Sequence, residues 1–343
     1  MSAATEGAPV ETPPSPPARS EVRAVPRVAE PASFWVRWAP AAWPARRRPW
    51  LDLARGGPGA GGRRAPDRVP EVTGGPFDDV LYLPPVPMDL AAGRDELARG
   101  HLARGTPVLA QCLAGDPLPP AGCVVVHDLL PTLLDRDLDA LAALPPGAVC
   151  AWPLLPGLTD PPELVSAGLD RLAAAGAAVV QPAVPRLAAA ERRRLAESYG
   201  EEAAFDALFH GPPPDDRRLA AAVAARGMAV FLQRPLPRPP LGGAVARRLA
   251  GILALVGEVW LRTGRTPSQG QAFFRAARWI DESGYDPEAL AREGNLGVVG
   301  AVDPMSREVL EEAVASGEEP ALLTELLAEY CGGGKATGER TSR

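Results

Sequence analysis

Between residues 77 and 240, short apolar runs alternate with longer segments of mixed polarity. Six of the runs have the length of β-strands, and they are continuously apolar rather than alternating. Continuous apolar runs are typical of strands that are covered on both faces, as in parallel sheets. The six predicted strands are residues 80–83, 107–110, 123–126, 148–152, 177–180 and 228–232.

Segments of helical length separate most of these runs: residues 89–105, 129–144, 161–176, 186–199 and 215–227. Gly105, Gly176 and Gly227 end three of them directly before the next strand, which suits a helix C-terminus that needs a left-handed residue. The connection over residues 113–122 is an exception, because ten residues with three prolines are too few for a crossover helix.

This repeated strand–helix pattern predicts an α/β fold with a parallel sheet and right-handed crossovers. Six strands fall short of the eight in a closed (β/α)₈ barrel. We therefore expect an incomplete (β/α) barrel of about six parallel strands, with an open doubly wound sheet as the alternative.

No strand-like run follows residue 240, and the pattern there predicts a helical C-terminal subdomain. Its expected helices are residues 243–263, 267–283, 287–294, 304–316 and 320–330. The first of these has a broad apolar face that Glu258 interrupts. Arg262 follows four residues later, and this spacing predicts an ion pair on the helix surface.

Changes in composition divide the chain into five parts. Residues 1–30 are rich in Pro, Ala and Glu and predict a disordered tail, and residues 31–76 form a Trp- and Arg-rich arm with a linker. Residues 77–240 are the expected partial barrel and residues 241–331 the helical subdomain. Residues 332–343 are a Gly-rich flexible tail.

Charge and cysteine content narrow the classes of function. A formal net charge of −6 argues against nucleic-acid binding through bulk charge. The four cysteines, at positions 112, 123, 150 and 331, lack the spacing of a zinc site and are too sparse for a disulfide scaffold. Cys112, Cys123 and Cys150 each lie in or beside an apolar run, so we expect these three to be buried, inert thiols, and we expect no bound metal. The N-terminus has no apolar signal segment and no apolar stretch is long enough to span a membrane, which predicts a cytoplasmic protein.

The arm concentrates aromatic and basic residues. Four of the seven tryptophans, Trp35, Trp38, Trp43 and Trp50, lie within sixteen residues, among several arginines. These side chains suit packing of the arm onto the barrel, or docking to a protein partner, because Trp and Arg are enriched at interface hot spots. The acidic chain as a whole disfavours nucleic acid as the partner.

Ligands of parallel α/β folds bind at the carboxyl ends of the strands, so polar residues there are the candidates for a site. The candidates for ligand binding are Asp89, Gln111, Gln181, Gln233 and Arg234. The candidates for catalysis are His127 and Asp128, since an imidazole can exchange a proton near neutral pH. In the alternative interpretation Asp128 caps the next helix and a backbone carbonyl satisfies His127.

One segment resembles a known family. Residues 151–160 read Ala-Trp-Pro-Leu-Leu-Pro-Gly-Leu-Thr-Asp and lead into a helix and then Gly-Ala-Ala-Val-Val at residues 176–180. This segment is similar to a turn in radical SAM barrels related to spore photoproduct lyase. The resemblance covers residues 148–182 well and residues 77–235 loosely, and it implies a partial barrel of about six βα units.

The chain departs from that family at its cofactor. The family holds an iron–sulfur cluster through Cys-x-x-x-Cys-x-x-Cys near the first strand, because the cluster needs close thiolate ligands. Here the first strand is followed by Pro-Pro-Val-Pro-Met-Asp at residues 84–89, without a cysteine. The resemblance therefore implies a degenerate relative that has no cofactor.

Together these observations favour a non-catalytic, proline-rich binding or accessory protein, a pseudoenzyme that acts with a protein partner through residues 34–50. The strand ends carry amides and single ionisable groups rather than a matched acid–base pair, a nucleophile triad or a metal-ligand set. The alternative is an enzyme that acts on a small anionic or sugar-like molecule with His127, Asp128, Asp89 and Arg234. The sequence leaves both functions open.

Overall fold

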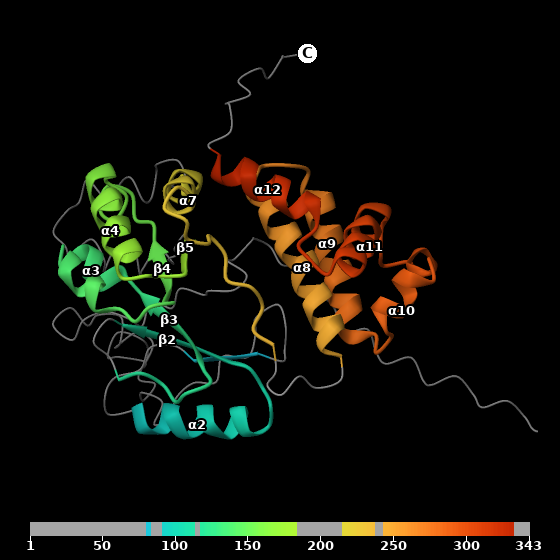
Figure 1. The fold of residues 1–343 in the computed structure, drawn as a ribbon, viewed down its shortest axis with the longest axis horizontal. Coiled ribbons are helices and arrows are strands. Elements are labelled where there is room, and N and C mark those ends of the chain that lie inside the picture. Colours follow the sequence, from blue (N-terminus) through green and yellow to red (C-terminus); the bar gives the residue numbers. More distant parts are fainter. Residues whose placement is uncertain (1–79, 84–90, 114–116, 184–214, 237–242, 333–343) are drawn as a thin grey trace, which may run out of the picture. The chain divides into compact units, whose positions relative to one another are not determined.

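The computed structural model describes residues 80–83, 91–113, 117–183, 215–236 and 243–332, all within the unit Ala32–Arg343 (Figure 1). Several predicted features lie outside these residues. They are the tail at 1–30, the arm and linker at 31–76, the helix at 186–199 and nearly all of the tail at 332–343.

In the part of the chain that the structure describes, five parallel strands form one sheet, and their order in the sheet is their order in the sequence. They are β1 (Leu81–Leu83), β2 (Val108–Leu113), β3 (Val124–Asp128), β4 (Val149–Pro153) and β5 (Val179–Ala183). An α/β fold with a parallel sheet is thus confirmed, but the described residues do not contain six strands. The sixth apolar run contributes only an isolated bridge, in which Ala229 exchanges two backbone hydrogen bonds with the chain around Val179.

The strands continue past the predicted apolar runs at their carboxyl ends. Gln111, His127, Asp128 and Gln181 belong to the strands themselves rather than to the loops after them. The pairing that extends these strands is made by backbone groups, which do not require apolar side chains.

The helices between the strands agree with most of the predicted segments. They are α2 (Ala91–Ala103), α4 (Pro162–Ala174) and α7 (Asp216–Ala224). The predicted helix at 129–144 is instead divided into α3 (Leu130–Leu134) and a 3₁₀ helix, η3 (Leu138–Ala143). Arg136 lies between the two with a φ of 58°, a left-handed conformation that a continuous helix does not accommodate.

The glycine positions confirm the predicted helix ends. Gly105, Gly176 and Gly227 all have a positive φ, between 74° and 78°. Only glycine adopts this conformation without a steric penalty, so each residue can end its helix and turn the chain toward the next strand.

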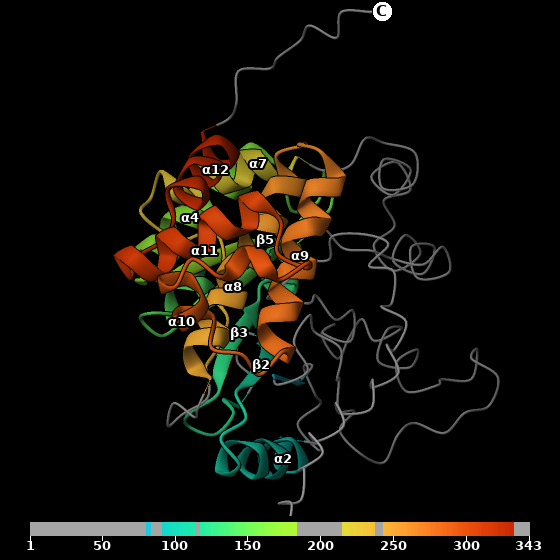
Figure 2. The ribbon, with the colours of Figure 1, turned by 90° about the vertical axis from the view of Figure 1, so that its right-hand side faces the viewer.

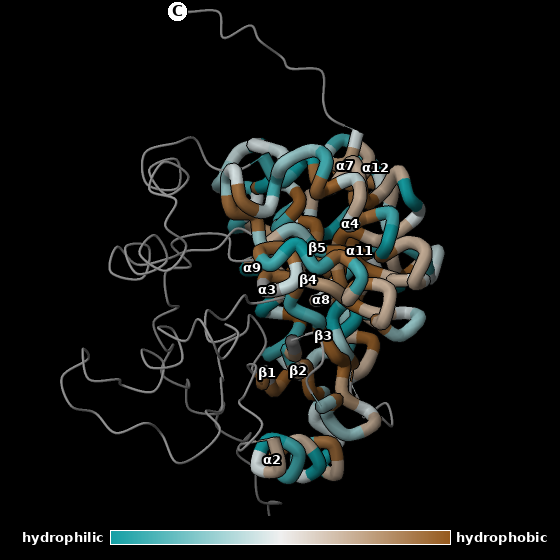
Figure 3. Tube along the Cα trace, turned by 90° about the vertical axis from the view of Figure 1, so that its left-hand side faces the viewer, coloured by the Kyte–Doolittle hydropathy of each residue, from teal (hydrophilic) through white to brown (hydrophobic). Residues whose placement is uncertain are grey.

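Alternate side chains of each strand point to opposite faces of the sheet. On one face, α2 packs on a small core of Leu81, Leu83, Val108 and Ala110, and α4 packs on Trp152. Along α2 the chain mixes polar and apolar positions, as the hydropathy colours show (Figure 3). We call this face the helix-covered face.

The C-terminal region is helical, as predicted (Figure 2). Its elements are α8 (Ala244–Arg262), α9 (Pro267–Glu282), α10 (Pro287–Arg292), η4 (Leu296–Val298), α11 (Pro304–Ser316) and α12 (Ala321–Cys331). Helices α8 and α9 approach closely at two glycines, because a Cβ on Gly257 would lie 3.1 Å from the carbonyl oxygen of Gly270. Helix α12 packs against both α7 and α8.

None of the described helices combines the length and the apolar character that crossing a bilayer requires.

Candidate functional site

Two of the predicted ligand-binding and catalytic residues meet at the carboxyl ends of β2 and β3. The Gln111 side chain donates from Nε2 to Oδ2 of Asp128 at 3.0 Å, and both residues are at most 3% exposed. The other carboxylate oxygen of Asp128, Oδ1, accepts from the backbone N–H of Leu130 at 2.9 Å. Asp128 therefore caps the start of α3, as the alternative interpretation expected.

His127 lies on the opposite face of the sheet from Asp128. Its neighbours in the strand register are Cys112 on β2 and Cys150 on β4. All three side chains are on the helix-covered face. The residue is 4% exposed, and its Nδ1 has no hydrogen-bond partner among the residues that the structure describes. Burial lowers the pKa of His127, so the ring is neutral at physiological pH. The predicted catalytic pair is thus divided between two faces.

Gln181 is buried on the same face as Asp128, since Ala151 is the register partner of both residues. The three polar side chains Gln111, Asp128 and Gln181 therefore share one face of the sheet. Asp89 and the four tryptophans of the arm fall outside the described residues, so their predicted roles stay predictions.

Gln233 and Arg234 both bond to residues of the C-terminal region. Arg234 makes a two-point ion pair with Asp281 of α9, at 2.8 and 3.0 Å, and donates to the Arg247 carbonyl at 3.2 Å. Gln233 donates to Glu319 at 2.8 Å. Both residues line a cavity of about 300 Å³ whose other walls come from α8, the α11–α12 connection and α12. Of the other candidate residues that the structure describes, none lines this cavity.

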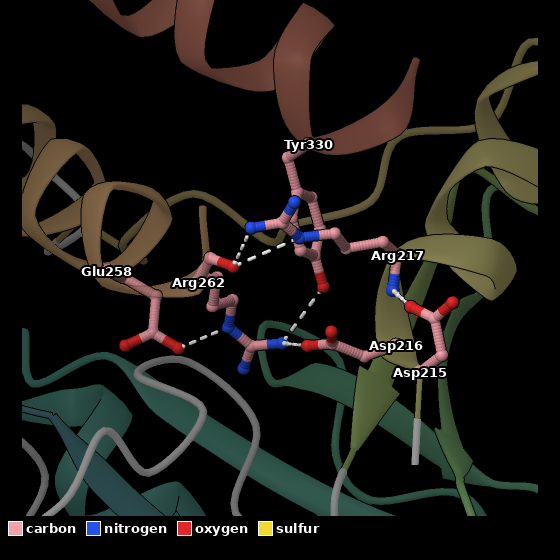
Figure 4. A network of polar contacts seen from close by, with 6 residues as sticks. All are labelled: Asp215, Asp216, Arg217, Glu258, Arg262 and Tyr330. Atoms are coloured by element: carbon pink, nitrogen blue, oxygen red, sulfur yellow. Dashed lines mark hydrogen bonds and ion pairs between the residues drawn. The ribbon is translucent and has the colours of Figure 1, made fainter. Parts of the chain in front are cut away.

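A buried polar network joins α7, α8 and α12 (Figure 4). Arg262 donates from Nε to Glu258 at 2.6 Å, and from Nη1 to Asp216 at 2.8 Å and to the Tyr330 hydroxyl at 3.2 Å. Arg217 donates to the backbone carbonyl of Arg262 at 2.8 and 3.2 Å. We call these five residues the Arg262 network.

Glu258 and Arg262 do form the predicted ion pair, but the prediction that it lies on the helix surface is wrong. Glu258 is fully buried, and its partner Arg262 is reached from two other elements: Asp216 of α7 and Tyr330 of α12, the helix that packs against both α7 and α8. Burial alone would lower the pKa of Arg262, but the surrounding Glu258, Tyr330 and Asp216 outweigh burial and raise it. Burial also raises the pKa of Tyr330, so its hydroxyl stays protonated.

Asp216 and Tyr330 are not among the residues predicted from the sequence. The one signal that pointed to them was Glu258 itself, a charged residue inside the apolar face of a helix. Such a residue needs a partner from another element when that face is buried.

The cysteines are placed largely as predicted. Cys112 and Cys150 are buried, while Cys123 and Cys331 are half-buried. Burial raises the pKa of Cys150 to about 12, which leaves it a neutral thiol. Within the described ranges, no group of three or more His, Cys, Asp or Glu side chains is arranged to hold a metal ion.

No protein-family model, no curated protein and no solved structure matches this chain.

Proposed function

We propose that this chain is a non-catalytic binding or accessory protein, built on a degenerate radical SAM-like partial barrel, that acts with a protein partner through residues 34–50. The observation that carries the proposal is the separation of His127 from Asp128 on opposite faces of β3. Both carboxylate oxygens of Asp128 already accept hydrogen bonds from Gln111 and Leu130. A proton relay between the two residues has no geometric basis in this arrangement.

The order of the strands supports the barrel part of the proposal. A doubly wound sheet reverses its strand order at a switch point, whereas a barrel adds each new strand beside the previous one. Here β1 to β5 follow the sequence without a reversal, and Ala229 continues beside β5 at Val179.

The segment that resembles radical SAM proteins has a packing role here that fits a degenerate relative. Thr159 is fully buried, accepts from the Leu155 N–H at 2.7 Å and donates to the Pro153 carbonyl at 2.6 Å. The Trp152 indole N–H donates to the Thr159 carbonyl at 2.9 Å. These bonds join the end of β4 to the start of α4, and they use the polar groups of the turn internally.

The alternative, an enzyme for a small anionic or sugar-like molecule, has its best support in the cavity at Gln233 and Arg234. Asp281 neutralises Arg234 through a two-point pair, however, so this guanidinium is not available to an anion. We therefore favour the accessory function over the enzyme.

The test is quantitative purification of the tagged full-length chain from its own cells. We expect a partner protein in stoichiometric amount, and we expect a variant with Trp35, Trp38, Trp43 and Trp50 all changed to Ala to retain less than about a tenth of it. A His127→Gln variant, changed on the helix-covered face, is the matched control and keeps the partner. The proposal is wrong if no partner accompanies the chain, or if the tryptophan variant binds it as well as the parent.

A further inference from the structure

A single imidazole lies between two buried thiols on the helix-covered face of the sheet. The strand register places Cys112, His127 and Cys150 side by side on β2, β3 and β4. Both cysteines are completely buried, and the histidine nearly so. We call these three residues the Cys–His–Cys row.

Burial of His127 within the row favours the neutral imidazole. A neutral ring leaves Nδ1 without a hydrogen bond, whereas a protonated ring would in addition bury a positive charge. Neither neighbour can offset that charge. Cys150 is a neutral thiol, and the Cys112 sulfur already lies 3.7 Å from the guanidinium Nη1 of Arg94, which is itself a cation.

Several charged groups on the surrounding elements are engaged with other partners. On α2, Arg94 pairs with Asp95 at 2.9 Å. Over β3 and β4, Asp139 of η3 pairs with Arg171 of α4 at 3.2 Å, and both of these side chains are exposed. Asp128, the adjacent residue of β3, points to the opposite face and bonds to Gln111.

We propose that the Cys–His–Cys row is an acid-sensitive element, in which protonation of His127 opens the helix-covered face at β3 and exposes the thiols of Cys112 and Cys150. In the open state the ring is solvated and has an ordinary pKa of roughly 6.5. In the closed state burial holds the pKa of His127 lower. The open state therefore binds the extra proton as the pH falls below about 6.5, and the opening equilibrium increases by up to about tenfold for each pH unit.

Thiol reactivity measures this opening directly. In the full-length chain with Cys123→Ser and Cys331→Ser, only Cys112 and Cys150 remain to react with 4,4′-dithiodipyridine, which reacts with thiols in mild acid as well as at neutral pH. Rates are compared at pH 7.5 and 5.5, relative to free cysteine at the same pH. We expect the relative rate to rise about tenfold at pH 5.5, and to change less than about twofold when His127→Gln is added.

Equal rises with and without His127→Gln, or no rise with histidine present, would overturn the proposal. A second measurement does not depend on the folding of the glutamine variant. The chain has three histidines, so a proton NMR titration of the unsubstituted protein, assigned with His101→Asn and His210→Asn, resolves each ring. We expect His127 to titrate below the ordinary range, and a pKa at or above roughly 6.5 for this ring contradicts the proposal.

Discussion

The pair of Gln111 and Asp128 and the Arg262 network are both buried, but they join very different stretches of chain. The pair connects residues 17 positions apart on neighbouring strands. Arg262 connects to Glu258 four positions away, to Asp216 at 46 and to Tyr330 at 68. The pair orders the end of one strand and the start of α3, whereas the network attaches the C-terminal helices to α7.

The two groups also differ in their charge. The pair combines a neutral amide with one carboxylate, which the backbone of Leu130 also stabilises. The network surrounds one guanidinium with the two carboxylates of Glu258 and Asp216. Removing one member of a buried charge cluster leaves the others without compensation, so the network is the more sensitive of the two.

The largest loss of stability is expected from a substitution of Arg262. We expect Arg262→Met to lower the free energy of unfolding by about 3–5 kcal/mol, because the buried Glu258 and the largely buried Asp216 lose their counter-charge. Urea denaturation measures the change. The matched control is Arg278→Met, which removes an exposed pair with Glu282 at the same four-residue spacing and costs under about 0.5 kcal/mol. Similar losses in the two variants would mean that the Arg262 network is no stronger than a surface pair.

A smaller effect is expected at the strand ends. Asp128→Ala removes the cap of α3 and leaves the buried Gln111 amide unpaired, and we expect a loss of about 2–3 kcal/mol in thermal or urea unfolding. Adding Gln111→Leu to this variant should recover about 1 kcal/mol of it, since the unpaired amide is then gone. Purely additive losses would show that the two side chains do not stabilise each other.

The smallest expected losses of stability come from adding a Cβ at a closely packed glycine, Gly168 in α4 or Gly270 in α9. A Cβ on Gly168 would lie 2.7 Å from Cη2 of Trp152, a ring that is fixed by its bond to Thr159. A Cβ on Gly270 would lie 2.6 Å from Cδ2 of Leu261, a half-buried side chain that can rotate away. We expect Gly168→Ala to cost about 1–2 kcal/mol and Gly270→Ala less than about 1 kcal/mol, as judged by melting temperature. The reverse order would show that the α8–α9 contact is the more rigid one.

Much of the sheet could be predicted from the sequence because its strands are buried on both faces. Burial produces continuous apolar runs, and five of the six runs lie on the observed strands. The run at residues 228–232 is also continuously apolar, yet only Ala229 pairs with the sheet. An apolar composition indicates that a segment is buried. It does not determine how many of its residues pair with the neighbouring strand, because that depends on the path of the backbone.

The sheet faces of His127 and Asp128 were not predicted, because the predicted strand ended at residue 126, before both of them. Residues that follow a strand can act together, whereas adjacent residues inside β3 must point in opposite directions.

The Arg262 network could not be predicted for a different reason. The spacing of Glu258 and Arg262 is visible in the sequence, but no local pattern connects α8 to Asp216 or Tyr330, which reach it only through tertiary packing.

Tyr330 meets the Arg262 guanidinium from the last turn of α12, thirteen residues before the end of the chain. Because of this position, additions to the C-terminus and truncations of it should have different effects on the Arg262 network. A purification tag added after residue 343 leaves the phenol in place, whereas a stop codon at or before position 330 deletes it along with its aromatic contact to Phe231. Shortened versions made for crystallisation should therefore end after Cys331.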